Sequence, residues 1–159
     1  MVSILVPVYG VEKYIEKCAV SLFEQTCNDI EYVFVDDCSP DNSIGILEEV
    51  RKRYPERDKV KIIRHDRNRG LAAARKTALM ASVGDYVIHV DSDDWVSPDM
   101  VATLAEQAMK TGADLVDGNY YHATDSRVVK EFRHFEGRTE ISIKLLVSSS
   151  ELVDNRIWG

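Results

Sequence analysis

Hydrophobic residues in this chain form short continuous runs, separated by stretches with helical spacing. Apolar runs rich in β-branched residues predict strands at Val2–Val8, Ile30–Val35, Val60–Arg64 and Tyr86–Val90, and Leu115-Val116 begins a fifth. Apolar positions that recur every three or four residues predict helices over about Val11–Gln25, Asp41–Tyr54, Leu71–Ala81 and Ser97–Lys110. Strands and helices therefore alternate along the chain.

The strand runs are apolar throughout, without the alternation of a strand that has one face in water. Such runs are typical of strands that are buried on both faces. Together with the alternating order they predict an α/β, Rossmann-like fold, with a mostly parallel sheet and helices on both faces. After Tyr120 the pattern weakens, and we expect an added strand within Arg127–Phe135 and a short helix within Arg138–Val147.

Residues at the helix ends have recognisable types. Ser39-Pro40 and Ser97-Pro98 each offer a Ser as N-cap and a Pro for the first helical position. Thr111-Gly112 has the Gly that commonly ends a helix. These pairs predict two helix starts and one helix end.

Composition narrows the class of protein. The 159 residues include 20 Lys and Arg against 27 Asp and Glu, for a net charge of −7. An acidic chain lacks the basic surface that broad nucleic-acid binding needs. No apolar run approaches the length of a membrane span, and the N-terminus lacks the pattern of a signal peptide. Three cysteines at irregular spacing match no zinc pattern and favour reduced thiols, so we expect a cytoplasmic protein.

Polar clusters follow each of the first four predicted strands. They are Tyr9-Gly10, Asp36-Asp37, His65–Gly70 and Asp91–Asp94. In a parallel sheet of this kind, ligands bind beyond the carboxyl ends of the strands. These four clusters therefore predict one site along one edge of the sheet.

Asp91 and Asp93 are the strongest candidates for a metal site. Two carboxylates placed two residues apart, directly after a strand, can both turn toward one Mg²⁺ or Mn²⁺ ion that is shared with substrate phosphates. The alternative is that both side chains only accept loop N–H groups and cap the following helix. The neighbouring polar clusters favour the metal interpretation.

The other clusters leave alternatives open. One residue of Asp36-Asp37 fits a turn, and the other is available to a base or ribose. Asn68 to Gly70, with Arg75 one turn later, could meet a phosphate at a helix start. Equally, Asn68 could cap the helix, Gly70 could serve a tight turn and Arg75 could be solvated. His89, inside the fourth strand, fits a core histidine better than a metal ligand.

Four ordered motifs resemble the nucleotide-sugar half of family 2 glycosyltransferases with the GT-A fold. They are Ser3-Ile-Leu-Val-Pro-Val-Tyr-Gly10, Tyr32-Val-Phe-Val-Asp-Asp-Cys-Ser-Pro-Asp41, Asn68-x-Gly70 with Ala74-Arg75, and Gly84-Asp-Tyr-Val-Ile-His-Val-Asp-Ser-Asp-Asp-Trp95. The resemblance implies inverting transfer of a sugar from a nucleoside diphosphate, usually UDP, with Mn²⁺ or Mg²⁺ as cofactor. It covers residues 1–118, which we expect to form the donor-binding core.

The resemblance also implies residue roles. Pro7 and Tyr9 would line the base pocket, and Asp37 would accept a hydrogen bond from the uracil imide. Asp66 and the stretch from Asn68 through Gly70 to Arg75 would flank the base and the diphosphate. Asp91 would lie near the ribose and Ser92 would contact the nucleotide, while Asp93, with Asp91 beside it, would hold the metal.

The acceptor side is expected to be incomplete. In this family the base that deprotonates the acceptor lies in the acceptor half, beyond a segment like Asn155–Gly159, so we name no catalytic residue and expect 119–159 to be the incomplete start of the acceptor-side region. The acceptor would be a saccharide or a lipid-linked saccharide, which allows association with the inner face of the membrane, and a homo-oligomer is conceivable. Two alternatives stay open: a non-catalytic nucleotide-binding fragment, and a haloacid-dehalogenase-like phosphatase that also uses an Asp-x-Asp after a strand.

Overall fold

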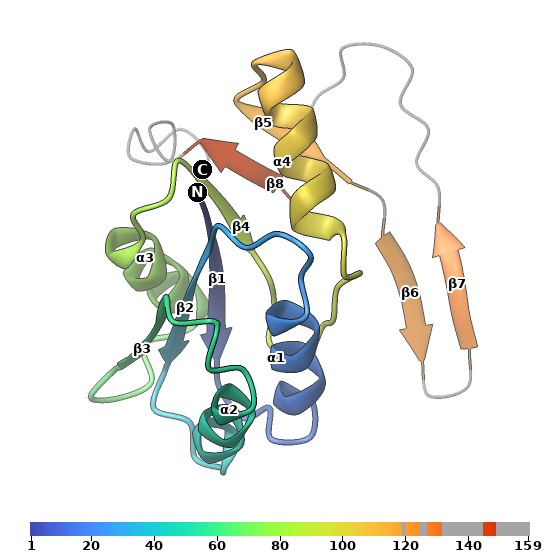
Figure 1. The fold of residues 1–159 in the computed structure, drawn as a ribbon. Helices are drawn as coiled ribbons and strands as arrows, with labels where there is room; N and C mark the ends of the chain where they lie inside the picture. The colour runs from blue at the N-terminus through green and yellow to red at the C-terminus, as the bar shows by residue number, and fades with distance from the viewer. Residues whose placement is uncertain (119, 125–126, 132–144, 149–159) are drawn as a thin grey trace.

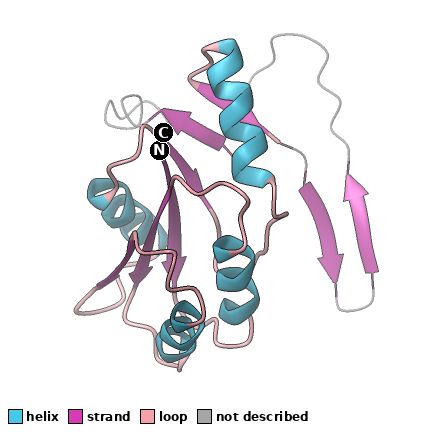
Figure 2. Cartoon of the chain, in the orientation of Figure 1, coloured by secondary structure: helices cyan, strands magenta, loops and turns pink. Residues whose placement is uncertain are grey.

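A computed structural model describes residues 1–118, 120–124, 127–131 and 145–148 of the chain. Figures 1 and 2 show the arrangement of these elements. In chain order they are β1 (Val2–Val8), α1 (Ile15–Phe23), β2 (Ile30–Asp36), α2 (Ser43–Lys52), β3 (Val60–Arg64), α3 (Leu71–Ala81), β4 (Tyr86–His89), α4 (Met100–Thr111), β5 (Leu115–Asp117), β6 (Tyr120–Thr124), β7 (Arg127–Glu131) and β8 (Leu145–Ser148).

The main sheet has the strand order β3-β2-β1-β4-β8-β5. β1 pairs in parallel with β2 on one side and with β4 on the other, and β2 pairs in parallel with β3. The chain thus lays down β1, β2 and β3 in one direction and then returns to the far side of β1 for β4. This reversal between β1 and β4 is the switch point where open α/β sheets form their ligand crevice.

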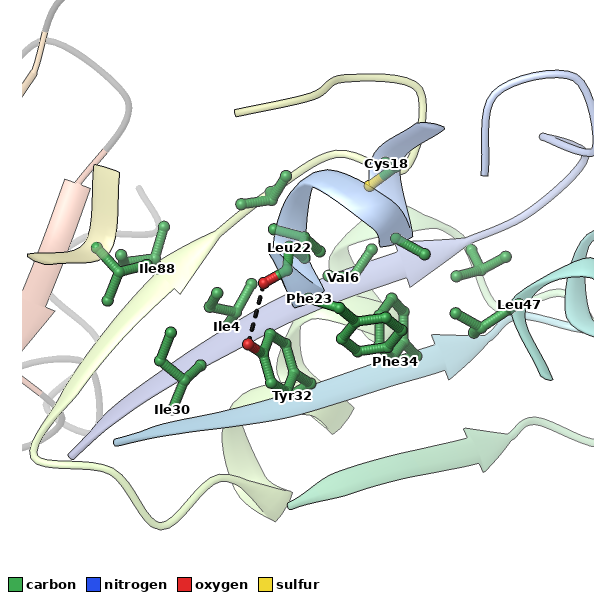
Figure 3. Packing of buried hydrophobic residues seen from close by; sticks show 14 of the residues in the cluster. Ile4, Val6, Cys18, Leu22, Phe23, Ile30, Tyr32, Phe34, Leu47 and Ile88 are labelled. Atoms are coloured by element: carbon green, nitrogen blue, oxygen red, sulfur yellow. Dashed lines mark hydrogen bonds between the residues drawn. The ribbon is translucent and has the colours of Figure 1, made fainter. Parts of the chain in front are cut away.

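Helices cover both faces of the sheet, as the apolar strand runs predict. On one face α1 and α2 pack over the strands, with Phe23 in edge-to-face contact with Tyr32 and Phe34 at centroid distances of 5.1 and 6.1 Å. Figure 3 shows this cluster, in which the Tyr32 hydroxyl donates to the Leu22 carbonyl at 3.0 Å. On the other face α3 packs Ala74 and Ala78 against β1, β2 and β4.

The spacing of apolar residues explains why these helices pack as they do. In α1 the buried residues are Ile15, Cys18, Ala19, Leu22 and Phe23, which recur at helical intervals and form one apolar stripe. In α3 the buried residues are alanines, so the helix lies close to the strands. That close approach brings the N-terminus of α3 near the carboxyl end of β1.

The sheet is not parallel throughout. β8 lies between β4 and β5 and is antiparallel to both. The predicted helix within 138–147 is therefore wrong at 145–147, where Leu145–Ser148 forms a strand; 138–144 lie outside the described residues. The apolar residues of this segment belong to a strand inside the sheet. Periodicity alone does not distinguish a short apolar run in a buried strand from one in a helix.

Two predicted helix starts are also wrong. α2 begins at Ser43 and α4 at Met100, and neither Ser39 nor Ser97 caps a helix. The Ser39 hydroxyl instead accepts from the Gly10 N–H at 2.8 Å. The predicted helix end is confirmed, because Gly112 is the C-cap of α4 with a left-handed φ of 63°.

Beyond β5 the described strands form a second pairing. β6 and β7 make a separate antiparallel ribbon, and β7 confirms part of the strand predicted within 127–135. The expected division at residue 118 stays a prediction, although β8 contributes to the main sheet from the later segment. Among the described residues, none of the helices has both the length and the apolar character needed to cross a membrane.

Candidate functional site

A cavity of about 360 Å³ lies at the carboxyl ends of β1 and β4. It is lined by Pro7, Val8, Tyr9, Val11, Asp37, Asn68, Gly70, Leu71, Ala74, Asp91, Ser92 and Asp93. All four polar clusters of the sequence analysis therefore contribute to one edge, and each of them reaches the cavity by at least one residue expected there. The parallel pairing of the first four strands is what gathers these loops.

Asp91 and Asp93 lie on the loop that follows β4. The Asp94 N–H donates to the Asp91 carbonyl at 3.0 Å, which closes a turn and places both carboxylates on the cavity wall. Within the described residues no backbone N–H donates to either carboxylate, and α4 begins only at Met100. The interpretation that they cap the next helix is therefore not supported.

Arg75 and Asp91 form an ion pair across the cavity rim. The Arg75 Nη2 lies 2.7 Å from Asp91 Oδ1. Arg75 does not line the cavity itself, and its buried Nε has no hydrogen-bond partner among the described residues. Because Arg75 already offsets the charge of Asp91, exposed Asp93 is the carboxylate with more freedom to bind a cation.

The loop of the acidic pair rests on α1. The Cys18 thiol lies below it, with Sγ 3.8 Å from the Asp91 carbonyl, and burial together with the nearby Asp94, Asp93 and Asp91 charges raises the pKa of Cys18 to about 12. Lys17 stacks its ammonium 3.1 Å from the centroid of the Trp95 ring. Cys18 is thus an inert packing thiol, and all three cysteines are unpaired.

His89, at the end of β4, is held neutral. Burial lowers the pKa of His89 to about 4, with the neighbouring Arg75 charge acting in the same direction. A neutral imidazole at this point adds no positive charge to the acidic loop.

Asp37 forms the opposite wall of the cavity. Its Oδ1 accepts from His65 Nδ1 at 2.6 Å and from the Arg69 N–H at 2.8 Å, and its Oδ2 accepts from the Gly70 N–H at 2.7 Å. Burial acts to raise the pKa of Asp37, but these hydrogen bonds outweigh it and hold the pKa below its usual range. Asp37 is therefore an ionised acceptor at neutral pH.

Asp36 has the turn role that one member of this pair was expected to have. It accepts from the Ser39 N–H at 2.7 Å and from Arg64 Nε at 2.6 Å, and it is 1% exposed. The adjacent Asp37 is the one that reaches the cavity. The structure thus gives the turn role to Asp36 and places Asp37 in the cavity lining.

The N-terminus of α3 opens on the cavity. Gly70 is the N-cap with a φ of 85°, and its N–H is shared by Asp37 and by Asn68 Oδ1. The first intrahelical bond of the described contacts runs from Ala74 N to the Gly70 carbonyl, so the N–H groups between them have no carbonyl of the helix to bind. Such groups favour an anion.

Asp66 does not line the cavity. It is 64% exposed and pairs with Arg69 at 2.8 Å on the surface, away from the cavity lining. Arg69 in turn contributes its backbone N–H to Asp37. The side chain of Arg69 is therefore engaged in a surface ion pair.

The loop after β1 is anchored by the loop after β2. The Gly10, Val11 and Glu12 N–H groups donate to Ser39 Oγ, Ser43 Oγ and Asp41 Oδ2 at 2.8, 3.0 and 3.0 Å. Gly10 has a φ of 67°, a conformation that favours glycine. These bonds fix the backbone on either side of Tyr9 and Val11, the two side chains that this loop gives to the cavity.

The residues present suit a divalent cation shared with a ligand. No group of three or more His, Cys, Asp or Glu side chains that could hold a metal occurs within the described part of the chain. Mg²⁺ is commonly bound by one or two carboxylates together with substrate phosphates and water, and Mn²⁺ accepts the same oxygen ligands. Asp91 and Asp93 match that sparse ligand set.

Several residues of this edge were given no role by the sequence analysis. His65, Thr77 and Asp41 support the cavity from behind, and Val11 and Leu71 line it with apolar surface. Their hydrogen bonds join segments that are distant in sequence, so no local spacing marks them. The position of His65 directly after a strand was the one available signal.

Comparisons with known proteins place the chain in a family. The sequence model described as "Glycosyl transferase family 2" matches residues 3–153. The uncharacterized glycosyltransferase EpsJ of Bacillus subtilis (strain 168) is 41% identical over 127 residues, which are 80% of this chain and 36% of EpsJ. Glycosyltransferase GlyA of Streptococcus pneumoniae is 42% identical over 125 residues, 79% of this chain and 17% of GlyA.

Solved structures agree with this placement. S. aureus TarS 1-349 in complex with UDP-GlcNAc superposes with a TM-score of 0.83 at 27% identity, covering 98% of this chain and 47% of that chain. The mannosyltransferase PcManGT from Pyrobaculum calidifontis, in complex with GDP-Man and Mn²⁺, gives a TM-score of 0.66 at 26% identity over 72% of this chain and 34% of that one. This chain spans less than half the length of these relatives. It belongs to glycosyl transferase family 2 and has the GT-A fold.

Proposed function

We propose that this chain binds the donor of an inverting glycosyltransferase (of the hexosyltransferase type), which transfers a sugar from a nucleoside-diphosphate sugar, with UDP as the nucleotide. The observation that carries the proposal is the cavity itself. It brings an ionised hydrogen-bond acceptor, a helix N-terminus and an acidic pair to one edge of the sheet. These are the groups that a base, a diphosphate and a cation require.

Asp37 favours uracil as the base. Its carboxylate has about four acceptor positions, and three are used by His65, Arg69 and Gly70. The single position left suits one ring N–H, such as the imide of uracil, better than the two adjacent N–H donors of guanine. The UDP-GlcNAc complex of TarS supports the same choice.

Pro7 and Tyr9 would pack against the base, and the N-terminus of α3 would bind the phosphates. Pro7 and Tyr9 lie on the cavity wall next to Asp37, where a base can pack against them, and Tyr9 is 48% exposed. The N–H groups at the start of α3 are available to a phosphate oxygen, with Asn68, Gly70 and Ser92 beside them. Arg75 would attract the diphosphate from behind Asp91, whereas Asp66 has no contact in the cavity to support a role.

Asp93 and Asp91 would hold Mn²⁺ or Mg²⁺. When bound, the cation would neutralise the charge that develops on the departing diphosphate. Asp91 would remain tied to Arg75, which fixes its orientation. The mannosyltransferase complex with Mn²⁺ supports this assignment.

The acceptor side rests on relatives and family. Chondroitin synthase of Escherichia coli is 36% identical over 110 residues, which favours a saccharide acceptor and a role in polysaccharide synthesis. A lipid-linked acceptor, a cytoplasmic site at the inner membrane face and a homo-oligomer complete the proposal. An enzyme that inverts the anomeric centre needs a base that deprotonates the acceptor on the face opposite the diphosphate, and we assign that role to none of the described residues.

Binding of UDP with and without metal tests the proposal. With MnCl₂ present and UDP at about 100 times its Kd, binding adds about 2.7 kcal/mol, which raises the Tm by about 5–10 °C in a domain of this size. We expect little shift with EDTA. Asp93→Asn should remove the metal-dependent shift, while Asp99→Asn, an equal charge change at an exposed N-cap without a side-chain cap bond, should keep it.

The two alternatives give different results. A non-catalytic fragment would bind UDP with metal but neither transfer nor hydrolyse a UDP-sugar. A phosphatase would release phosphate from a generic phosphate ester and show no preference for a nucleoside. Absence of a shift with every nucleoside diphosphate would refute donor binding.

A further inference from the structure

His65 is fixed at three points behind the cavity. Its backbone N–H donates to the Asp36 carbonyl at 2.8 Å, Nδ1 lies 2.6 Å from Asp37 Oδ1, and Nε2 lies 2.8 Å from Thr77 Oγ1. The residue is 5% exposed. It therefore joins the end of β3 to the end of β2 and to α3, without lining the cavity itself.

The partners of His65 define how its ring is protonated. Asp37 is an ionised carboxylate that can only accept, so Nδ1 must carry a hydrogen. In the neutral ring Nε2 is then an acceptor, and the Thr77 hydroxyl is the donor that fills it. Asp37 thus sets the tautomer, and Thr77 holds the other side of the ring by filling Nε2.

His65 also decides which oxygen of Asp37 remains open. The backbone supplies one N–H to each oxygen, from Arg69 to Oδ1 and from Gly70 to Oδ2. These two bonds alone leave the oxygens alike. The bond from His65 fills Oδ1, so within the described contacts the remaining acceptor position is on Oδ2.

We propose that His65 is a positioning residue for base recognition, which Thr77 orients and which holds the Asp37 carboxylate with one acceptor position open to the cavity. The proposal rests on the proposed function, because it assigns a role within the same donor site. It goes further in naming what sets base selectivity. His65 would act on the base through Asp37 and would not touch the nucleotide.

The chemistry of pyrimidines makes this testable. Uracil presents an N–H at ring position 3, whereas cytosine presents a lone pair there. An open carboxylate lone pair therefore accepts from UDP and repels CDP, and sites built around such a bond reject the unmatched ligand. If the bond from His65 is lost, Asp37 has two open acceptor positions and its carboxylate can turn. Water can then fill the second position, and the preference for UDP over CDP falls.

The experiment compares UDP, CDP and inorganic pyrophosphate, each titrated calorimetrically with MnCl₂ present into the 159-residue chain. Wild type should bind UDP at least about tenfold more tightly than CDP. His65→Ala should reduce that ratio about fivefold or more and leave pyrophosphate binding unchanged. His65→Asn keeps an N–H donor at the position of Nδ1 and should restore most of the ratio.

Thr77→Val is the second variant, because it removes the hydroxyl that orients His65 from a half-buried position at nearly constant volume and leaves the backbone bonds from Arg69 and Gly70 to Asp37 intact. It should lower the UDP to CDP ratio by about twofold to threefold. If the UDP to CDP affinity ratio is unchanged in both His65→Ala and Thr77→Val, or if UDP, CDP and pyrophosphate lose affinity equally, the role proposed for His65 is refuted. Donor binding would stand in either case. Wild type that binds no UDP would overturn donor binding as well.

Discussion

Asp41→Asn tests whether one carboxylate fixes the loop that carries Tyr9. Asp41 Oδ1 accepts from Ser43 N, Ser43 Oγ and Ser39 Oγ at 3.1, 2.5 and 2.7 Å, and Oδ2 accepts from the Glu12 N–H at 3.0 Å. Asn retains one carbonyl oxygen for the first three donors but places an NH₂ group against the Glu12 N–H. Losing the charge and that one bond should cost about 1–2 kcal/mol of unfolding free energy at pH 7.

The pH dependence of this loss can be worked out. Partial burial acts to raise the pKa of Asp41, but the hydrogen bonds from Ser43 and Ser39 outweigh it and leave the pKa well below its usual value of 3.8. A carboxyl whose pKa falls on folding adds stability above the unfolded pKa and loses it as the pH drops toward the folded pKa. Between about pH 6 and pH 3 the loss is at most about 1.2 kcal/mol, and about 0.5–1 kcal/mol after solvent screening.

Urea unfolding followed by far-ultraviolet circular dichroism measures this. The difference in unfolding free energy between wild type and Asp41→Asn should shrink by about 0.5–1 kcal/mol between about pH 6 and pH 3. Other carboxylates titrate alike in both proteins and cancel. Asp58→Asn, at an exposed position with no side-chain hydrogen bond in the described contacts, should show no such trend. A difference that stays constant or grows on acidification would refute the reasoning.

Three further substitutions test packing and backbone geometry, each by urea unfolding. Gly84→Ala should destabilise the fold by about 2–3 kcal/mol, because the new Cβ would lie 2.8 Å from the Ser3 backbone N. In Gly45→Ala the new Cβ meets only the Asn42 side chain, which can move, so this variant should be neutral or stabilising. Equal effects of the two substitutions on the free energy of unfolding would contradict this reasoning. Cys38→Gly should stabilise by up to about 1 kcal/mol, because Cys38 has a φ of 60°, and a clear loss of stability would count against strain there. Tyr32→Phe should cost about 1 kcal/mol by removing a buried hydrogen bond to the Leu22 carbonyl, which keeps only the longer one from the Gln25 N–H at 3.4 Å, and a cost near zero would mean that this bond contributes nothing to stability.

The order of elements and the edge that bears the site could be predicted because both follow from local pattern. Continuous apolar runs defined the first four strands, and polar residues at their ends predicted the cavity that contains Asp37, Asp91 and Asp93. Apolar runs and polar strand ends can be recognised from a few neighbouring residues. Parallel pairing then places the polar ends together at the carboxyl-terminal edge of the sheet.

Other features depend on partners that are distant in sequence. Ser39 has the residue type of a helix cap, yet its hydroxyl binds Gly10 on the preceding loop. Arg75 was expected to meet a phosphate, and it pairs with Asp91 on the other side of the sheet edge. The interleaved position of β8 likewise depends on pairing with both β4 and β5. No local spacing encodes these contacts.

The antiparallel strand β8 has a consequence for how the site is assembled during synthesis. β4, which leads into the acidic loop, hydrogen-bonds on one side to β1 and on the other to residues 146–148, far later in the chain. While the ribosome is still translating the residues in between, that side of β4 is an unpaired edge, open to pairing with other chains. Contacts so distant in sequence form slowly. Closure of the sheet beside the acidic pair is therefore a late event in the life of the nascent chain, and a chaperone that shields β4 would act during that interval.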